Sequence, residues 1–288
     1  YRSLYLANEV ELTDKLNFYL RKFGISPRTF FVSTLKKIEI QQELLRVYKN
    51  ENIKLLITTT SFDSTIKNNE GISNFNLFEE LGIPVIQILT STKSRAEWKE
   101  SNIGMCPIDL LMQIIIPEFD GRITTIPCSF KELSSINNNL CTEVTKYQYD
   151  NDGLIWVIKL AVNYIKLNNL KNFHKNVCLI VSNYPVKNGR LANGVGLNTP
   201  ESIINILHWL KEEGYDTGNL DLPKSSKELM SMLIKARTND QISFKNKPLD
   251  YITLAEYKIF WDKLPFKSKE KIIKRWDYPE KSSDLEKK

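Results

Sequence analysis

One segment of the sequence, residues 183–202, combines basic and amide side chains with glycines in the order expected of a ligand-binding loop. It reads N-Y-P-V-K-N-G-R-L-A-N-G-V-G-L-N-T-P-E-S. Glycines let a backbone approach a ligand closely, and basic and amide groups bind carboxylates and amides. The pattern fits a binding loop for an anionic or amide-bearing molecule, and it also fits a plain connection with a good helix cap. The side chains that could contact a ligand are Lys187, Asn188, Arg190 and Asn193.

A second segment, residues 117–123, places two carboxylates and a guanidinium around one glycine, in P-E-F-D-G-R-I. In extended backbone Glu118 and Asp120 would share a face, because side chains then alternate with period two. Two close carboxylates could bind a divalent cation or accept protons. The alternative is a turn at the Asp-Gly step with a local Asp120–Arg122 pair, and the spacing alone favours this alternative.

A strand and a helix are predicted on either side of the first segment. The apolar run at residues 177–181 predicts a buried strand. Apolar residues at helical spacing then predict an amphipathic helix, and they are Ile203, Ile206, Leu207 and Leu210. Thr199 or Asn198 can cap this helix, and Pro200 suits its first position, where a missing N–H costs nothing.

Strands and helices alternate from residue 1 to about residue 117, which predicts an α/β fold. The expected strands are residues 29–33, 53–58 and 83–89, and the chain opens in what we expect to be a further strand. Three apolar strands separated by helices predict a doubly wound parallel sheet. The loops after these strands, including residues 58–61 and 90–94, would line the carboxyl edge, where such sheets bind ligands.

The second half of the chain predicts a long helix over residues 151–170 and shorter helices after residue 214. Ser225 and Ser226, Thr253, and Ser268 are the predicted caps of the three shorter helices. We place a domain boundary between residues 147 and 148, because residues 148–153 are polar and turn-like. Residues 1–147 would form the doubly wound domain, and residues 148–288 a second α/β segment with a helical C-terminal part.

The composition is that of a soluble globular protein, with 288 residues, 42% hydrophobic, 26% charged and a net charge of +6. The positive charge is spread over helix faces and a tail, so we expect no nucleic-acid partner. No apolar run is long enough for a membrane span. Four cysteines without a C-x-x-C pair predict reduced, mostly buried thiols in a cytoplasmic protein.

Two familiar nucleotide-binding patterns are missing from the sequence, namely G-x-x-x-x-G-K-[ST] and G-x-G-x-x-G. An unrelated nucleotide- or sugar-binding protein is therefore disfavoured.

Motifs spread along nearly the whole chain resemble the large subunit of ATP-dependent cobaltochelatase, in a family that includes the porphyrin-binding large subunit of magnesium chelatase. The two most specific are residues 117–123 and residues 194–200, G-V-G-L-N-T-P. The shorter matches are Y-R-S and Y-L-A near the start, F-V-S-T-L-K at 31–36, I-P-V-I-Q at 83–87, P-I-D-L at 107–110 and N-Y-P at 183–185.

Within that family, D-G-R-I and G-V-G-L resemble the cobalt branch. The chain departs from the expected pattern at two positions, with Asn198 where we expect Asp and Val186 where we expect a second Pro. Asn still caps a helix, so the fold is not threatened. A lost negative charge would matter if residue 198 touched metal or ligand.

The resemblance implies insertion of Co²⁺ into a corrin-ring precursor of the hydrogenobyrinic acid a,c-diamide type, in cobalamin biosynthesis. ATP and Mg²⁺ would be used by separate AAA+ motor subunits. The alternatives are a magnesium chelatase subunit that binds protoporphyrin, and a truncated tetrapyrrole-binding module without catalysis. Because the family's subunit is several times longer, we expect the chain to be an internal piece that assembles with the remaining segments and is marginally stable or inactive alone.

The resemblance also assigns roles to residues. Glu118 and Asp120 would be catalytic, with Glu118 as the metal ligand. Contacts to the macrocycle would come from Arg122, Asn183, Tyr184, Lys187, Arg190, Asn193, Gly196 and Asn198. Lys187 and Arg190 suit peripheral carboxylates, whereas the asparagines suit amides.

Overall fold

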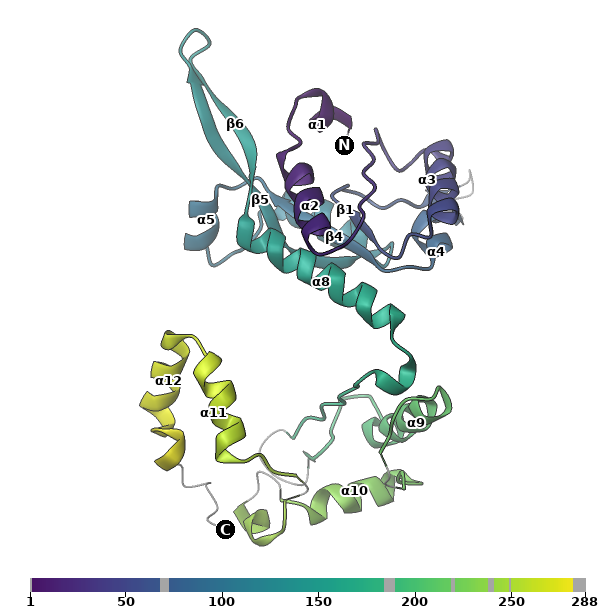
Figure 1. Cartoon of the computed structure of the whole chain (residues 1–288), viewed down its shortest axis with the longest axis vertical. Coiled ribbons are helices and arrows are strands. Elements are labelled where there is room, and N and C mark those ends of the chain that lie inside the picture. The colour runs from purple at the N-terminus through teal and green to yellow at the C-terminus, as the bar shows by residue number, and fades with distance from the viewer. Residues whose placement is uncertain are drawn as a thin grey trace. The chain divides into compact units, whose positions relative to one another are not determined.

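The computed structural model describes residues 2–67, 73–183, 190–218, 221–237, 241–248 and 250–281. It divides into two compact units, Tyr1–Leu170 and Lys171–Lys288, which are drawn in one view in Figure 1. The predicted boundary at 147/148 lies inside the last strand of the first unit. The polar stretch behind that prediction is the end of this strand and the capped start of a helix that packs on the same sheet.

The first unit is built on a four-stranded sheet with the order β1-β4-β5-β6. Its strands are β1 (Leu56–Thr58), β4 (Val85–Ser91), β5 (Ile123–Asn137) and β6 (Thr142–Tyr149). β1, β4 and β5 are parallel, and β6 pairs antiparallel with β5. A separate antiparallel pair is formed by β2 (Ile66–Lys67) and β3 (Ser73–Phe75). The predicted α/β class is confirmed. The sheet, predicted to be parallel, is mostly parallel, because β6 returns antiparallel beside β5.

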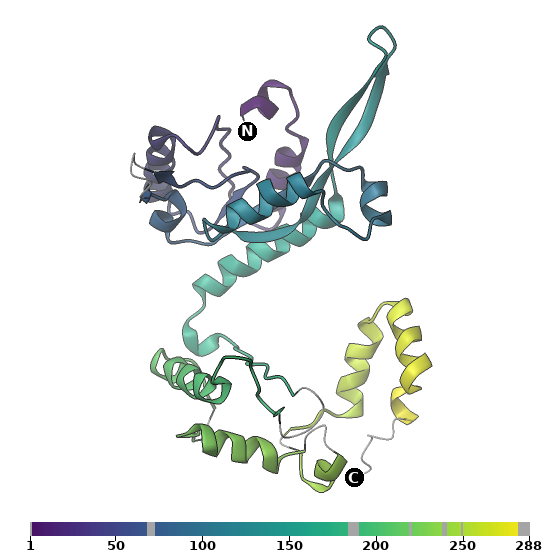
Figure 2. The same cartoon turned by 180° about the vertical axis from the view of Figure 1, so that it is seen from behind.

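Helices cover both faces of this sheet. On one face, α2 (Glu11–Lys22) and α8 (Asn151–Asn169) pack against β4 and β5 around Ile86, Ile88 and Val157, which are fully buried. The other face is covered by the crossover between β4 and β5, made of α6 (Pro107–Leu110), the π-helix η1 (Leu111–Ile115) and α7 (Ile116–Glu118). These three segments run on as one helix, which we call the crossover helix. It lies in front of the sheet in Figure 2, where the molecule is turned by 180°.

A second core lies beside β1. It is formed by α3 (Ile38–Glu51), α4 (Leu77–Leu81) and the start of β4, around the buried residues Leu35, Leu77 and Phe78. Two short helices complete the unit, α1 (Arg2–Leu6) and α5 (Arg95–Glu100). β5 and β6 continue beyond the sheet as a long hairpin arm (Figure 1).

The described part of the second unit is helical. Its helices are α9 (Thr199–Glu212), α10 (Ser226–Lys235), α11 (Leu254–Lys263) and α12 (Phe266–Trp276), with short 3₁₀ turns η2 (Asn172–His174), η4 (Gln241–Lys245) and η5 (Pro279–Lys281). Ile203 and Ile204 of α9 pack with Leu229 of α10 in a small core. The predicted caps Asn198, Ser225 and Thr253 are confirmed, because each side chain accepts a backbone N–H of the first turn.

Some predicted elements are wrong. Residues 2–6 are a helix, and residues 29–33 and 177–181 form no strand. Ile180 is 92% exposed, and no described strand pairs with its segment. Ser268 lies inside α12 because that helix already begins at Phe266, directly after Pro265. The β5–β6 arm was not expected.

Candidate functional site

Arg122 is the centre of a buried polar network at the start of β5. Its Nη1 donates to the Thr60 carbonyl at 2.7 Å and to Gln87 Oε1 at 2.9 Å. Its Nη2 donates to the Phe62 carbonyl at 2.6 Å. The guanidinium carbon also lies 4.7 Å from the centre of the Phe78 ring. Arg122 therefore joins β4, β5 and the loop that follows β1.

Asp120 is the anionic partner of this arginine. Its Oδ2 accepts Arg122 Nη2 at 2.7 Å and the backbone N–H of Ser64 at 2.8 Å. Neither the Asp120 side chain nor the Arg122 side chain is exposed to solvent. A buried pair with this many hydrogen bonds is a rigid structural joint, which we call the Asp120–Arg122 clamp. The local pair that the sequence spacing favoured is therefore present.

Glu118 points to a different environment from Asp120. It is the last residue of α7 and is exposed, whereas Asp120 is buried. The backbone between them is a helix end followed by a turn, in which Gly121 has a φ of +70°. Because the segment is not extended, the two carboxylates do not share a face. The clamp fixes the turn, and the turn leaves the Glu118 carboxylate open to solvent.

The crossover helix is held to the end of β4 by two polar side chains. Asp109 Oδ2 accepts the backbone N–H of Thr92 at 2.9 Å and its hydroxyl at 2.7 Å. Gln113 accepts the N–H of Thr90 at 2.8 Å and donates to its carbonyl at 2.7 Å. Residues 90–94 lie at the carboxyl edge of the sheet, as predicted. Thr90 and Thr92, at the start of this segment, are hydrogen-bonded to the crossover helix.

These partners of the two networks were missed from the sequence. Gln87 interrupts the apolar run of β4, and Asp109 and Gln113 lie four residues apart in an otherwise apolar helix. A polar residue in an apolar run is a signal for a buried hydrogen-bond partner. That signal marks Gln87, but it does not identify Arg122 as its partner across 35 residues.

The loop before α9 forms a compact structure over residues 190–199. Asn183 bridges Leu191, and Gly194 bridges Leu197. Asn198 Oδ1 accepts the N–H of Glu201 at 3.4 Å and so caps α9. Arg190, Asn193 and Asn198 are exposed. The predicted residues Tyr184 and Lys187 lie outside the described residues.

Two polar atoms in this loop region are buried without a hydrogen-bond partner, namely Asn183 Oδ1 and Thr199 Oγ1. Burying an unpaired polar group costs free energy. Both atoms are closed to solvent inside the loop region. Gly196, with a φ of +73°, supplies the left-handed backbone that the loop needs just before Leu197.

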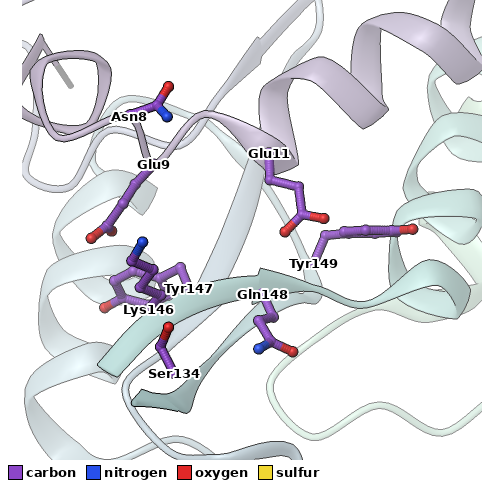
Figure 3. Close-up of a pocket in the computed structure, with 8 residues that line it drawn as sticks. All are labelled: Asn8, Glu9, Glu11, Ser134, Lys146, Tyr147, Gln148 and Tyr149. Atoms are coloured by element: carbon purple, nitrogen blue, oxygen red, sulfur yellow. The ribbon is translucent and has the colours of Figure 1, made fainter. Parts of the chain in front are cut away.

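A pocket of about 320 Å³ lies in the first unit. Figure 3 shows Glu9, from the segment ahead of α2, and Glu11, the first residue of α2, projecting toward β6. Burial raises the pKa of Tyr147 in this pocket, and the charges of Asp109 and Glu9 add to the effect. The full lining is Asn8, Glu9, Glu11, Ser134, Lys146, Tyr147, Gln148 and Tyr149. It includes none of the predicted site residues.

No group of three or more His, Cys, Asp or Glu side chains in the described parts of the chain is arranged to hold a metal ion. The cysteines are free thiols. Cys128 is buried, as predicted, and its burial raises the pKa of the thiol to about 12. Cys141 and Cys178 are exposed, against prediction, because the first lies in the hairpin arm and the second in residues 177–181. Among the described helices, none has the length and apolar character of a membrane span.

Comparison with known proteins identifies relatives along the entire chain. A family model described as CobN/Magnesium Chelatase matches residues 1–288. The aerobic cobaltochelatase subunit CobN of Pseudomonas aeruginosa is 30% identical over 258 residues, which is 89% of this chain and 20% of the relative. A magnesium-chelatase subunit of Chlorobaculum parvum is 30% identical over 179 residues, 62% of this chain and 13% of the relative.

A solved structure supports the same relationship. The catalytic subunit of cobaltochelatase from Mycobacterium tuberculosis matches with a TM-score of 0.73 and 26% identity. The match covers 97% of this chain and 23% of that one. The chain thus spans about a fifth of the length of its cobaltochelatase relatives.

Proposed function

The chain belongs to the CobN/magnesium chelatase family, and from this premise we propose that it is part of the large catalytic subunit of an ATP-dependent cobaltochelatase. That subunit inserts Co²⁺ into a corrin-ring precursor of the hydrogenobyrinic acid a,c-diamide type, in cobalamin biosynthesis. ATP and Mg²⁺ are used by AAA+ motor subunits in the cytoplasm, consistent with the missing phosphate-binding loop in this sequence.

The observation that supports the proposed chemistry is that Glu118 is exposed next to the buried Asp120–Arg122 clamp. Metal insertion needs an oxygen ligand that takes a hydrated cation and an acceptor for the ring N–H protons. Glu118 is exposed, and its backbone is held by the clamp two residues away. A carboxylate with this freedom, on a fixed support, suits both tasks.

Asp120 and Arg122 have a different part in this proposal from the one that the resemblance implied. Both side chains are fully buried and bound to each other and to backbone groups. They therefore act as positioning residues for Glu118 rather than by touching metal or ring.

The loop before α9 is the proposed contact for the macrocycle. Arg190 would bind a peripheral carboxylate, together with Lys187, since charge-assisted hydrogen bonds are the stronger ones. Asn193 and Asn198 would bind ring amides, with Asn183, Tyr184 and Gly196 close by in the chain. Asn198 also caps α9, and its amide group still carries donor hydrogens for a ligand.

Cobalt is preferred over magnesium because of the extent of the similarity. The cobaltochelatase subunit of Sinorhizobium sp aligns over 97% of this chain. The magnesium-chelatase subunits of Chlorobaculum parvum and Rhodobacter capsulatus align over 62% and 48% of it. A magnesium chelatase subunit that binds protoporphyrin is the second candidate, and a tetrapyrrole-binding module without catalysis is the third.

The test has two stages. In the first, the chain is titrated with hydrogenobyrinic acid a,c-diamide and with protoporphyrin, and binding is followed by visible absorbance. Tighter binding of the corrin precursor is expected, whereas failure to bind either ring contradicts the proposed function. Preference for protoporphyrin would favour the second candidate.

In the second stage, Co²⁺ insertion is measured with ATP, Mg²⁺, the motor subunits and the remaining segments of the large subunit. Glu118→Gln should fold normally and lose most of the insertion rate, because it loses the charge that binds metal or takes a proton. Glu100→Gln is the matched control, since Glu100 is also an exposed residue at the end of a helix. A near-normal rate in Glu118→Gln would remove Glu118 from the mechanism. Ring binding without any insertion by the unaltered chain would favour the third candidate.

A further inference from the structure

Residues 194–197 form a tight turn directly before α9. The N–H of Leu197 donates to the Gly194 carbonyl at 3.1 Å, which closes the turn. Gly196, at its third position, has a φ of +73°. Glycine adopts this left-handed conformation readily, as the third position of such a turn requires. The second position of the turn is Val195.

The turn is held against the N-terminus of α9. The N–H of Thr199 donates to the Leu197 carbonyl at 2.9 Å, so the turn continues directly into α9. A Cβ atom added at Gly194 would lie 2.6 Å from Thr199 Oγ1. The turn and the first residue of the helix are therefore in close contact, and Val195 is presented by a supported backbone.

The apolar side chains of this turn are exposed. Val195 is 101% exposed and Leu197 is 59% exposed, whereas Ala192, two residues before the turn, is 2% exposed. Single exposed apolar residues are common and need no explanation. Here two of them belong to one supported turn, and Arg190 and Asn193, exposed polar residues, precede it in the same loop.

We propose that Val195 and Leu197 contact the face of the macrocycle, while Arg190 and Asn193 bind its rim; this inference rests on the function proposed above. A tetrapyrrole is a planar ring with apolar faces and with carboxylates or amides at its periphery. The loop has the same two-part character, with an apolar tip and polar flanks. Small-molecule sites commonly combine apolar contact with a few polar groups that fix orientation.

The experiment compares the unaltered chain with Val195→Ser/Leu197→Ser and with Val195→Ile. Each is titrated with hydrogenobyrinic acid a,c-diamide and with protoporphyrin. Loss of two apolar contacts should raise the Kd of the preferred ring by about tenfold or more. Val195→Ile keeps an apolar contact and should bind like the unaltered chain. Ile103→Ser is the matched control, because Ile103 is 83% exposed in the first unit.

Measuring the Kd at low and high salt distinguishes the apolar contact of Val195 and Leu197 from the charged contact of Arg190. The weakening in the serine variant should persist at high ionic strength, because apolar contact is not screened. The weakening caused by Arg190→Ala should shrink as salt screens its charge. Circular dichroism of the serine variant should match the unaltered chain, since the substituted positions are exposed.

The outcomes distinguish this inference from the proposed function. Ring binding by the unaltered chain with an unchanged Kd in the serine variant overturns the role of the turn and leaves the proposed function intact. That result would point to another part of the longer family polypeptide as the partner of Val195 and Leu197. No ring binding by the unaltered chain overturns both.

Discussion

The guanidinium Nη2 of Arg122 lies 2.7 Å from Asp120 Oδ2, and neither side chain has any surface exposed to solvent. The pair connects segments that are far apart in sequence, because Asp120 also accepts the N–H of Ser64 and Arg122 donates to the carbonyls of Thr60 and Phe62. The turn that follows Glu118 is thus fastened to the loop after β1. Moving that turn away from the loop would break these hydrogen bonds of two buried charged side chains.

Replacing Arg122 with Ala should lower the free energy of unfolding by about 3–5 kcal/mol, because it leaves the Asp120 carboxylate buried and unpaired. Thermal and urea unfolding of the chain measure the change. Arg46→Ala is the matched control, since Arg46 forms an exposed pair with Glu43 and its loss should have no measurable effect. A stability loss as small as that of the control would show that the clamp is not a structural joint.

Local features of the fold could be predicted from the sequence because their causes are local. Asn198, Ser225 and Thr253 were recognised as helix caps, and each cap bond links residues three apart. The strand predicted at residues 177–181 is wrong because strand formation depends on distant parts of the chain. An apolar segment becomes a strand only when another strand pairs with it, and pairing is decided by distant residues.

The site shows the same division. The Asp120–Arg122 pair was visible as a local possibility, but its burial depends on Gln87, Thr60 and Phe78, which no spacing rule connects to it. The shared face of Glu118 and Asp120 was inferred from period-two alternation. The segment is not extended, because Pro117 lies in the first turn of α7, a position that suits proline. The backbone leaves the helix after Glu118, and the two carboxylates therefore point in different directions.

Gly153→Ala should destabilise the first unit by about 1–3 kcal/mol, even though alanine favours helix by about 1 kcal/mol. A Cβ atom at Gly153 would lie 2.5 Å from the Pro127 carbonyl oxygen, a backbone atom of β5. Asn163→Ala on the exposed side of α8 is the control and should be neutral or stabilising. Equal or higher stability of Gly153→Ala in urea unfolding would contradict this close approach of helix and strand.

Alkaline pH should weaken the fold through Cys128. Its thiol has an ordinary pKa of 9.0, and burial raises the pKa in the folded state to about 12. Below pH 9 the thiol is protonated in both states, so its full contribution is present. Between about pH 9 and 12 only the unfolded state releases the proton, so stability falls by about 1.4 kcal/mol per pH unit.

The measurement is urea unfolding of the unaltered chain and of Cys128→Ala at pH 8 and pH 10.5. Cys128→Ala should be less stable at pH 8 and should lose less stability on going to pH 10.5. Cys141→Ala, at an exposed cysteine, should follow the unaltered chain. Parallel pH dependence in Cys128→Ala and the unaltered chain would assign the alkaline loss to other groups.

Replacing both Lys187 and Arg190 with Ala should weaken macrocycle binding and leave metal binding nearly unchanged. Charge-assisted hydrogen bonds contribute about 1.5–3 kcal/mol each, so each lost contact should raise the Kd by about ten- to a hundredfold. Arg190 is exposed beside the 194–197 turn, whereas Lys187 lies outside the described residues. The methyl ester of the same ring lacks the carboxylates, so its binding should be insensitive to the substitutions. Lys227→Ala/Lys235→Ala, at exposed positions of α10, is the control for lost positive charge. An unchanged Kd for the carboxylate form, or an equal loss with the ester, would show that these two residues do not bind the ring carboxylates.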